Sequence, residues 1–194
     1  MSDGLDRRDA VARLLAGRRD LLVVAGLGSS CWDVAAAGDH ARDFGLWGAM
    51  GGAAMVGLGL ALAQPRTPVL VVTGDGEQLM GLGSLATIAL QGPGNLVVVV
   101  LDNGLYGETG GQRSHAAGPT DLAAVAAACG IADSRTIATT AALEAFAPRV
   151  HRVGAAPAFA RIRVDAREHR RVLPPRDGAF LKDRMRAALG LDPL

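Results

Sequence analysis

Short, uninterrupted apolar runs, each followed by a glycine-bearing segment, constrain the fold of this chain most strongly. Val97–Val100 is a run of valines with no polar alternation, which is typical of a strand buried on both faces. Other apolar runs end at Ala25, before Gly26–Ser30, and at Thr73, before Gly74–Gly76. Segments with helical periodicity separate these runs. The alternation predicts an α/β fold with a mostly parallel sheet flanked by helices.

The expected helices and strands alternate along the chain. Helices are expected over residues 6–16, 49–64, 79–90, 121–128, 140–150 and 180–189. Strands are expected over residues 21–25, 68–73, 95–101, 134–138 and 158–164. A single domain is expected over residues 1–194, with its core at about 21–164 and a basic C-terminal extension at 165–194. Ligands of such sheets bind beyond the carboxyl ends of the strands, so segments 26–30, 74–76 and 102–111 form the candidate site.

Charge and cysteine usage exclude several classes of protein. The formal net charge is +1, which provides no basic field for nucleic acid. Cys31 and Cys129 lack the spacing of a disulfide framework, a zinc site or an iron–sulfur cluster. Residues 1–19 are too polar for a secretory signal, and the apolar stretch 49–63 is too short to span a bilayer. A cytoplasmic protein that binds neither nucleic acid nor a membrane is expected.

Gly74-Asp75-Gly76 and Asn103 form the most informative spacing in the chain, with twenty-six residues between Gly76 and Asn103. Each group follows an expected strand, so a carboxylate and an amide oxygen reach the same edge of the sheet. Such oxygen ligands suit Mg²⁺. Two diphosphate oxygens and a water can complete the octahedron around this ion. Gly76 allows backbone N–H groups to approach phosphate, and the next helix directs its positive N-terminus towards it.

This pattern resembles the diphosphate-binding motif of thiamine diphosphate enzymes. The resemblance implies that Asp75, Asn103 and the backbone carbonyl of Leu105 ligate Mg²⁺. The cofactor-binding residues that it implies in this part of the chain are Gly74, Asp75, Gly76, Glu77, Asn103, Leu105 and Tyr106. Many relatives have serine in place of Glu77. Because a diphosphate repels a carboxylate, the Glu77 side chain is expected to turn away from it.

Two further segments agree with this family, and they occur in its order. Leu46–Gly51 is similar to the segment that holds the aminopyrimidine in decarboxylases and acetohydroxyacid synthases. The resemblance implies that the Gly48 carbonyl accepts from the 4′-amino group. It also implies that the Met50 side chain lies beneath the cofactor and enforces its bent shape.

The segment Gly28, Ser29 and Ser30 resembles the early Gly-Thr-Ser loop of the same family, whose hydroxyl and amides reach the diphosphate. A dinucleotide-binding loop is the alternative interpretation of these glycines. It fails because Cys31 occupies the position of the third glycine in that fingerprint.

The resemblance covers residues from about Leu21 to Val164, which correspond to the diphosphate-binding domain alone. In the family, the glutamate that activates the aminopyrimidine comes from a separate pyrimidine-binding domain. The resemblance therefore implies a partner, a pyrimidine-domain (α) subunit that supplies this glutamate within a hetero-oligomer.

Asp102–Gln112 narrows the resemblance to sulfopyruvate and phosphonopyruvate decarboxylases, which share a DNG-x-x-x-S-T-G-G-Q stretch. The implied function is that of a diphosphate-binding β subunit of a two-component decarboxylase acting on a small anionic 2-oxoacid. Glu108 stands where these relatives usually have serine, so Glu108 and His115 are the candidate catalytic residues. Arg113 and His115 are also candidates for holding the distal sulfonate or phosphonate of the substrate. The alternative for all three is an ordinary loop position.

Two other functions remain open at this level. One is a carboligase subunit similar to acetohydroxyacid synthase, and the other is a cofactor-binding or regulatory subunit without activity. Asp75, Asn103 and Gly48 are intact, which disfavours an inactive subunit. The ferredoxin-linked class is disfavoured because its thiamine subunits commonly carry cluster cysteines.

Overall fold

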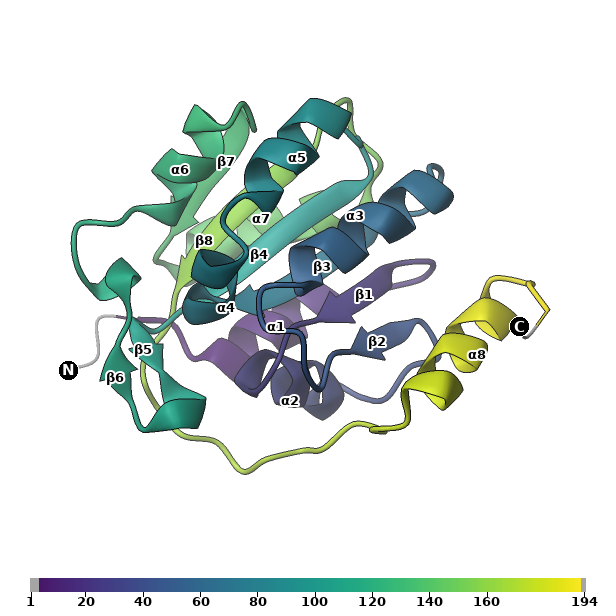
Figure 1. Cartoon of the computed structure of the whole chain (residues 1–194), viewed down its shortest axis with the longest axis horizontal. Helices are drawn as coiled ribbons and strands as arrows, with labels where there is room; N and C mark the ends of the chain where they lie inside the picture. Colours follow the sequence, from purple (N-terminus) through teal and green to yellow (C-terminus); the bar gives the residue numbers. More distant parts are fainter. Residues whose placement is uncertain (1–3, 193–194) are drawn as a thin grey trace.

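Parallel strands form the six-stranded central sheet of the protein, as seen in a computed structural model that describes residues 4–192 (Figure 1). The strands of this sheet are β1 (Leu22–Ala25), β2 (Asp43–Gly45), β3 (Val69–Gly74), β4 (Leu96–Asp102), β7 (Asp133–Ile137) and β8 (Ala158–Arg163). Their order is β2-β1-β3-β4-β8-β7, and every neighbouring pair is parallel. The expected α/β fold is confirmed.

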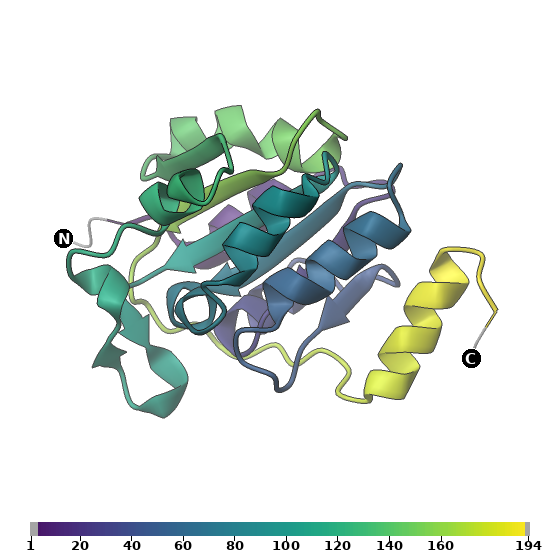
Figure 2. The same cartoon turned by 45° about the horizontal axis from the view of Figure 1, so that its top comes forward.

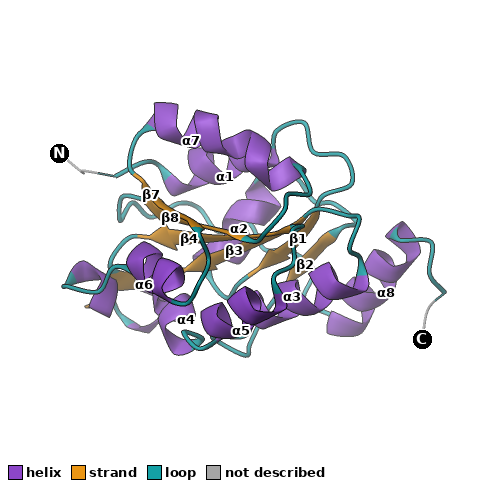
Figure 3. Ribbon diagram, turned by 90° about the horizontal axis from the view of Figure 1, so that it is seen from above, coloured by secondary structure: helices purple, strands orange, loops and turns teal. Residues whose placement is uncertain are grey.

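Helices cover both faces of the sheet (Figure 3). One layer consists of α1 (Arg7–Leu15), α2 (Ser29–Ala36) and α7 (Thr140–Phe146), which the 3-10 helix η3 (Ala147–His151) follows. The other layer consists of α3 (Ala53–Ala63), α4 (Asp75–Met80), α5 (Ser84–Gln91) and α6 (Leu122–Ala128). Within it, α3 and α5 lie side by side across the sheet (Figure 2). Among residues 4–192, no helix is both long enough and apolar enough to cross a membrane.

The valine run in β4 shows how the sheet divides the core in two. Successive side chains of a strand point to opposite faces. Val97 and Val99 accordingly pack with α1, α2 and α7, whereas Val98 and Val100 pack with α3, α5 and α6. Each face therefore needs an apolar side chain at every second position, and the strand needs one at every position.

Two expected helices differ from the helices found, and close backbone packing explains both differences. The helix expected over 79–90 is split into α4 and α5. Its break lies at Gly81, where an added Cβ would overlap the backbone of Gly51. The helix expected over 49–64 begins only at Ala53, because Ala49 and Gly51 have φ angles of 57° and 94° and form a turn.

The elements α2 and β2 were not predicted from the sequence. In α2 the buried face carries Asp33, whose carboxylate pairs with Arg7 at 3.1 Å and with Arg8 at 3.2 Å, both from α1. A buried charge of this kind interrupts the apolar periodicity that identifies a helix. In β2 the short strand contains one apolar side chain, that of Phe44.

The order of the strands determines where a ligand can bind. The chain passes from β1 through α2 to β2 on one side of β1, whereas β3 lies on its other side. The two crossovers leave the sheet in opposite directions at the carboxyl ends of β1 and β3. Such a topological switch point opens a crevice, which is the usual ligand site of open α/β sheets.

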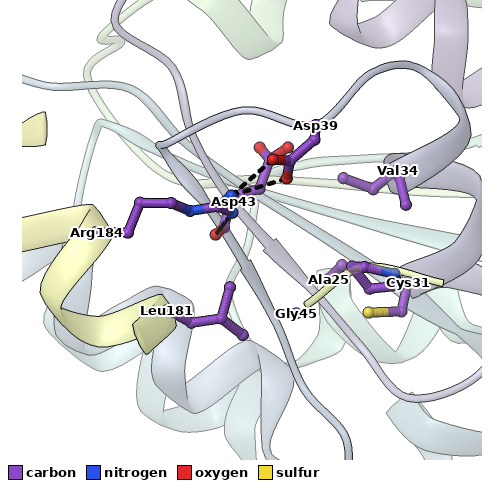
Figure 4. Close-up of a pocket in the computed structure, with 10 residues that line it drawn as sticks. Ala25, Cys31, Val34, Asp39, Asp43, Gly45, Leu181 and Arg184 are labelled. Carbon is purple, nitrogen blue, oxygen red and sulfur yellow. Dashed lines mark hydrogen bonds and ion pairs between the residues drawn. The ribbon is translucent and has the colours of Figure 1, made fainter. Parts of the chain in front are cut away.

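After β8 the chain runs past the carboxyl ends of the strands and then to α8 (Gly178–Ala188), which lies beside β2 at the edge of the sheet (Figures 1 and 3). Arg184 of α8 pairs with Asp39 at 2.8 Å, and Leu181 faces a small cavity that Cys31 and Asp43 also line (Figure 4). The helix thus covers the open edge of β2, a position that otherwise invites pairing with another chain.

Cys31, which is 3% exposed, is expected to resist thiol reagents in the folded protein. Burial, together with the negative charges of Glu77 and Asp43, raises the pKa of this thiol to about 12, so almost no thiolate forms at pH 8. Cys129 is half-buried. We expect Ellman's reagent to titrate Cys129 alone in the native protein and both thiols after denaturation.

A Cys129→Ser variant is the control for this titration, because its native form should show no fast-reacting thiol. Equal reaction rates for both thiols in the native wild-type protein would contradict the expectation. They would mean that α8 and the segment before it open readily enough to expose Cys31.

Candidate functional site

A cavity of about 430 Å³ lies at the carboxyl ends of β1, β3 and β4, where the topology places the crevice. The sequence-predicted site residues that line it are Ser29, Ser30, Met50, Gly74, Asp75, Gly76, Glu77, Asn103, Leu105, Tyr106 and Glu108. The predicted residues that do not line it are Gly28, Gly48, Arg113 and His115. The structure therefore gathers most of the predicted set around one space.

The first wall of the cavity is the beginning of α2. Gly28 precedes this helix with a φ angle of 77°, and Ser29 and Ser30 form its first turn. The Glu108 side chain lies directly against Gly28, where an added Cβ would contact its carboxylate. Glu108 therefore reaches across from the loop after β5 to the helix that follows β1.

The second wall carries Asp75, the first residue of α4, which is 2% exposed. The Ser114 hydroxyl donates a hydrogen bond to its Oδ2 atom. Burial raises the pKa of the Asp75 carboxyl to about 6. The negative charge of Asp102 on the adjacent strand adds to this effect, and the Ser114 hydrogen bond opposes it. Asp75 is thus a carboxylate kept out of water at the point where three loops meet.

Asp102 is neutralised by a partner that no sequence pattern indicated. Arg161 of β8 donates from Nε to the Asp102 carboxylate, and its Nη2 donates to the Ala116 carbonyl at 3.2 Å. The register of the sheet makes this possible, because Val100 pairs with Arg161 and thereby sets the arginine next to the end of β4. Arg161 also ties the loop after β6 to the sheet.

The loop after β4 brings Asn103 to the same cavity in a tight turn. The Asn103 Oδ1 atom accepts from the Leu105 N–H at 2.9 Å, and Gly104 between them has a φ angle of 71°. A hairpin follows, made of β5 (Leu105–Tyr106) and β6 (Gln112–Arg113), within a stretch that was predicted as a loop. The hairpin returns the chain so that Ser114 reaches Asp75.

Asp75 and Asn103 give this cavity one buried carboxylate and one amide side chain. Among residues 4–192, no group of three or more His, Cys, Asp or Glu side chains is placed to hold a metal ion. Neutral oxygens beside a single carboxylate match the preference of Mg²⁺, which keeps some of its positions for water or phosphate oxygens.

Gly76 and Tyr106 lie in close contact at the start of α4. A Cβ added to Gly76 would overlap the ring of Tyr106. The Tyr106 hydroxyl lies 3.4 Å from Nδ1 of His115, which is itself outside the cavity lining. The small size of Gly76 therefore serves the packing of Tyr106, a role that its position in the sequence did not indicate.

The Glu77 side chain packs against the end of β3. Its Oε2 atom accepts from the Thr73 hydroxyl at 2.8 Å, and a Cβ added to Gly26 would overlap the same carboxylate. Burial raises the pKa of Glu77, and its hydrogen bonds oppose this effect. The absence of a side chain at Gly26 is what makes room for this buried acid.

Arg113 does not line the cavity, and its Nη2 atom donates to the Ala117 carbonyl at 2.8 Å. The basic side chains that do line the cavity come from α1 and from the segment after β8, namely Arg7, Arg167, His169 and Arg171. Sequence reasoning assigned this segment no part in the site. Its basic composition was the one available signal.

The family described as "Thiamine pyrophosphate enzyme, C-terminal TPP binding domain" matches residues 27–164. Phosphonopyruvate decarboxylase of Streptomyces viridochromogenes is 54% identical over 122 residues, which are 62% of this chain and 30% of that protein. Sulfopyruvate decarboxylase subunit beta of Methanothermobacter thermautotrophicus is 44% identical over 126 residues, 65% of this chain and 67% of that subunit. The chain therefore spans less than a third of the first relative and about two thirds of the second.

A solved structure shares the fold at low sequence identity. The thiamine diphosphate-dependent 4-hydroxybenzoylformate decarboxylase of Rhodococcus jostii superimposes with a TM-score of 0.69 at 21% identity. The match covers 87% of this chain and 34% of that chain. At this identity the likeness shows the arrangement of helices and strands only. Any inference about chemistry has to come from the residues of the cavity.

Proposed function

The chain belongs to the family of thiamine pyrophosphate enzyme C-terminal TPP binding domains, and from this premise we propose that it is the diphosphate-binding subunit of a 2-oxoacid decarboxylase. One observation carries the proposal: Asp75, Asn103 and the start of α2 line a single cavity at the topological switch point. Relatives of this chain are named as phosphonopyruvate and sulfopyruvate decarboxylases. The preferred substrates are therefore small 2-oxoacids that carry a distal anion.

The residues of the cavity fit the cofactor. Asp75, Asn103 and the carbonyl of Leu105 would hold Mg²⁺, and the backbone N–H groups at the starts of α2 and α4 would bind the diphosphate. Met50, which lines the cavity, would support the bent cofactor. The Gly48 carbonyl, two residues earlier in the chain, would accept from its 4′-amino group. Thiamine diphosphate supplies the electron sink for decarboxylation when it is bound.

A pyrimidine-domain (α) subunit completes this proposal by supplying the activating glutamate. Support comes from the names of sulfopyruvate decarboxylase relatives that are called subunit beta. Glu108 is the preferred proton donor or acceptor within this chain, because its carboxylate lines the cavity. His115 would act through Tyr106, its contact in the cavity wall.

Cofactor binding is expected to raise the melting temperature of the full chain, because a ligand that binds only the folded state stabilises it. At a thiamine diphosphate concentration 100 times Kd, the gain is about 2.7 kcal/mol. The measurement is a thermal-shift titration with thiamine diphosphate and Mg²⁺. Thiamine without its diphosphate and a sample with EDTA are the controls, and both should shift the melting temperature far less.

The activity is tested on the chain co-purified with its partner, by measuring carbon dioxide release from phosphonopyruvate and sulfopyruvate. Absence of a thermal shift, both with and without the partner, would refute the proposed function. A thermal shift without decarboxylation would support cofactor binding and refute the proposed reaction.

A further inference from the structure

The segment that follows β8 forms one side of the cofactor cavity. Val164 and residues 166–169 line the cavity together with Arg171, and the same cavity is lined by Asp75 and Asn103. In Figure 1 this light-green segment passes the β5–β6 hairpin and α2 before it reaches α8. Apart from Val164, the residues that close the cavity on this side therefore lie outside the stretch that matches the family.

Several contacts fix the segment in this position. Val164 forms a parallel bridge with Leu5, and Asp165 donates its N–H to the Leu5 carbonyl at 2.9 Å. Farther along, the Arg8 side chain donates to the Arg170 carbonyl at 2.9 Å. The wall is thus held at two points along its length by the N-terminal part of the chain.

Most cations on this wall already have a carboxylate partner. Arg7 pairs with Asp33 at 3.1 Å, and Arg167 pairs with Asp6 at 3.1 Å. His169 lies 3.2 Å from the same Asp6 carboxylate. The charges of Arg7 and Arg167 are therefore largely compensated, and an incoming anion would compete with these carboxylates.

Arg171 differs from the other cations because, within the described residues 4–192, it forms no ion pair with a carboxylate. Its guanidinium lies over the ring of Trp32, 4.5 Å from the ring centroid. Trp32 belongs to the first turns of α2, which begins at Ser29 and Ser30, and all three residues line the same cavity. The structure thus holds an uncompensated cation close to the positive end of a helix.

Stacking on an aromatic ring positions a guanidinium without using its N–H groups. Within residues 4–192 the planar fork of Arg171 donors has no hydrogen-bond partner, and it matches the oxygens of phosphate-like groups. Because the side chain is already ordered by Trp32, binding an anion immobilises less additional side chain. Arg113, which was predicted to bind the distal anion, donates instead to the Ala117 carbonyl and lies outside the cavity lining.

We propose that Arg171, positioned by Trp32, is an anion-binding residue of this cavity and that it binds a phosphate, phosphonate or sulfonate group. Two sources share this chemistry, the diphosphate of the cofactor and the distal group of the substrate. The proposal rests on the proposed function for the identity of the anion, whereas the presence of an anion site rests on the geometry alone.

The test compares Arg171→Ala with Arg170→Ala in the full chain. Both variants remove one guanidinium from the same segment, but Arg170 does not line the cavity, and its carbonyl contact with Arg8 survives the substitution. Calorimetry with inorganic pyrophosphate and Mg²⁺, and separately with phosphonoacetate, measures Kd. We expect Arg171→Ala to raise one or both Kd values about 10- to 100-fold, the usual weight of a charge-assisted contact. Arg170→Ala should change them less than about 3-fold, because this charge lies outside the cavity lining and acts only through solvent-screened electrostatics.

Arg171→Lys separates charge from geometry, because it keeps the cation and loses the fork of donors. An intermediate Kd for this variant is the expected result. The proposal is overturned if Arg171→Ala binds both probes as tightly as the wild-type chain, if Arg170→Ala weakens binding as much as Arg171→Ala does, or if the wild-type chain binds neither probe.

Two further measurements show which molecule supplies the anion. One is the Kd of thiamine diphosphate, and the other is the KM of the assembled enzyme for its substrates. A raised Kd for thiamine diphosphate in Arg171→Ala identifies the cofactor diphosphate. A raised KM for phosphonopyruvate, with the KM for pyruvate unchanged, identifies the distal group of the substrate. Failure of the proposed function looks different: the wild-type chain would then bind pyrophosphate through Arg171 without binding thiamine diphosphate.

Discussion

Replacing Asp75 by asparagine is expected to weaken Mg²⁺-dependent binding of thiamine diphosphate at least ~100-fold, since loss of outer-shell partners of a metal alone costs 10- to 100-fold. Activity of the assembled enzyme should fall at least as far. The variant keeps the shape of the side chain and its contact with Ser114. It removes the single carboxylate in the proposed set of metal ligands.

The same substitution is expected to leave the cofactor-free chain at least as stable as the wild type at pH 8. Burial raises the Asp75 pKa from its ordinary 3.8 to about 6, so the folded state penalises the charged carboxylate relative to the unfolded state. The penalty is absent below the unfolded pKa, grows as the pH rises from about 4 to about 6, and is complete above the folded pKa. Asparagine is neutral throughout and does not carry this penalty.

Two thermal-shift series separate these effects, one without ligands and one with thiamine diphosphate and Mg²⁺. The cofactor-free variant should melt no lower than the wild type, and the shift on adding ligands should disappear. Asp20→Asn is a matched control, because its side chain is 74% exposed and lies away from the cavity. An Asp75→Asn variant that retains the full ligand-induced shift would show that this carboxylate does not hold the metal.

Phe159→Ala is expected to lower the free energy of unfolding by about 3–5 kcal/mol, the cost of deleting a buried aromatic side chain. Phe159 is fully buried on β8, where it pairs with Val98 and packs in the core under α3, α5 and α6. The loss is a large share of the ~5–15 kcal/mol that stabilises a typical domain. Urea unfolding monitored by circular dichroism measures it.

Phe180→Ala is the control for this measurement, because the Phe180 side chain on α8 is 49% exposed. It contacts the Arg184 guanidinium, so a loss below about 1 kcal/mol is expected. Equal losses for the two variants would show that the core beneath β8 is not packed as described.

The sequence predicted those parts of the protein that local patterns specify. The valine run of β4 and the apolar runs of β1 and β3 identified the centre of the sheet. The glycine-bearing segments after them identified the cavity, including Asp75 and Asn103. In these strands both faces are buried, so every residue contributes to the pattern.

The parts that sequence reasoning missed depend on partners far along the chain. Ser114 lies 39 residues from Asp75, and Arg161 lies 59 residues from Asp102. The wall that contains Arg171 likewise gains its place from contacts with the N-terminal segment. No periodicity or motif encodes such pairings, because each arises only when the sheet brings distant segments together.

The central position of β8 has a consequence for the order in which the protein matures. Ribosomal synthesis completes the residues of the proposed metal site long before β8, yet β8 separates β4 from β7 and carries the arginine that compensates Asp102. Closing such long loops is slow compared with forming local contacts. A nascent chain is therefore expected to carry the Asp102 carboxylate without its counter-charge until β8 has been inserted beside β4.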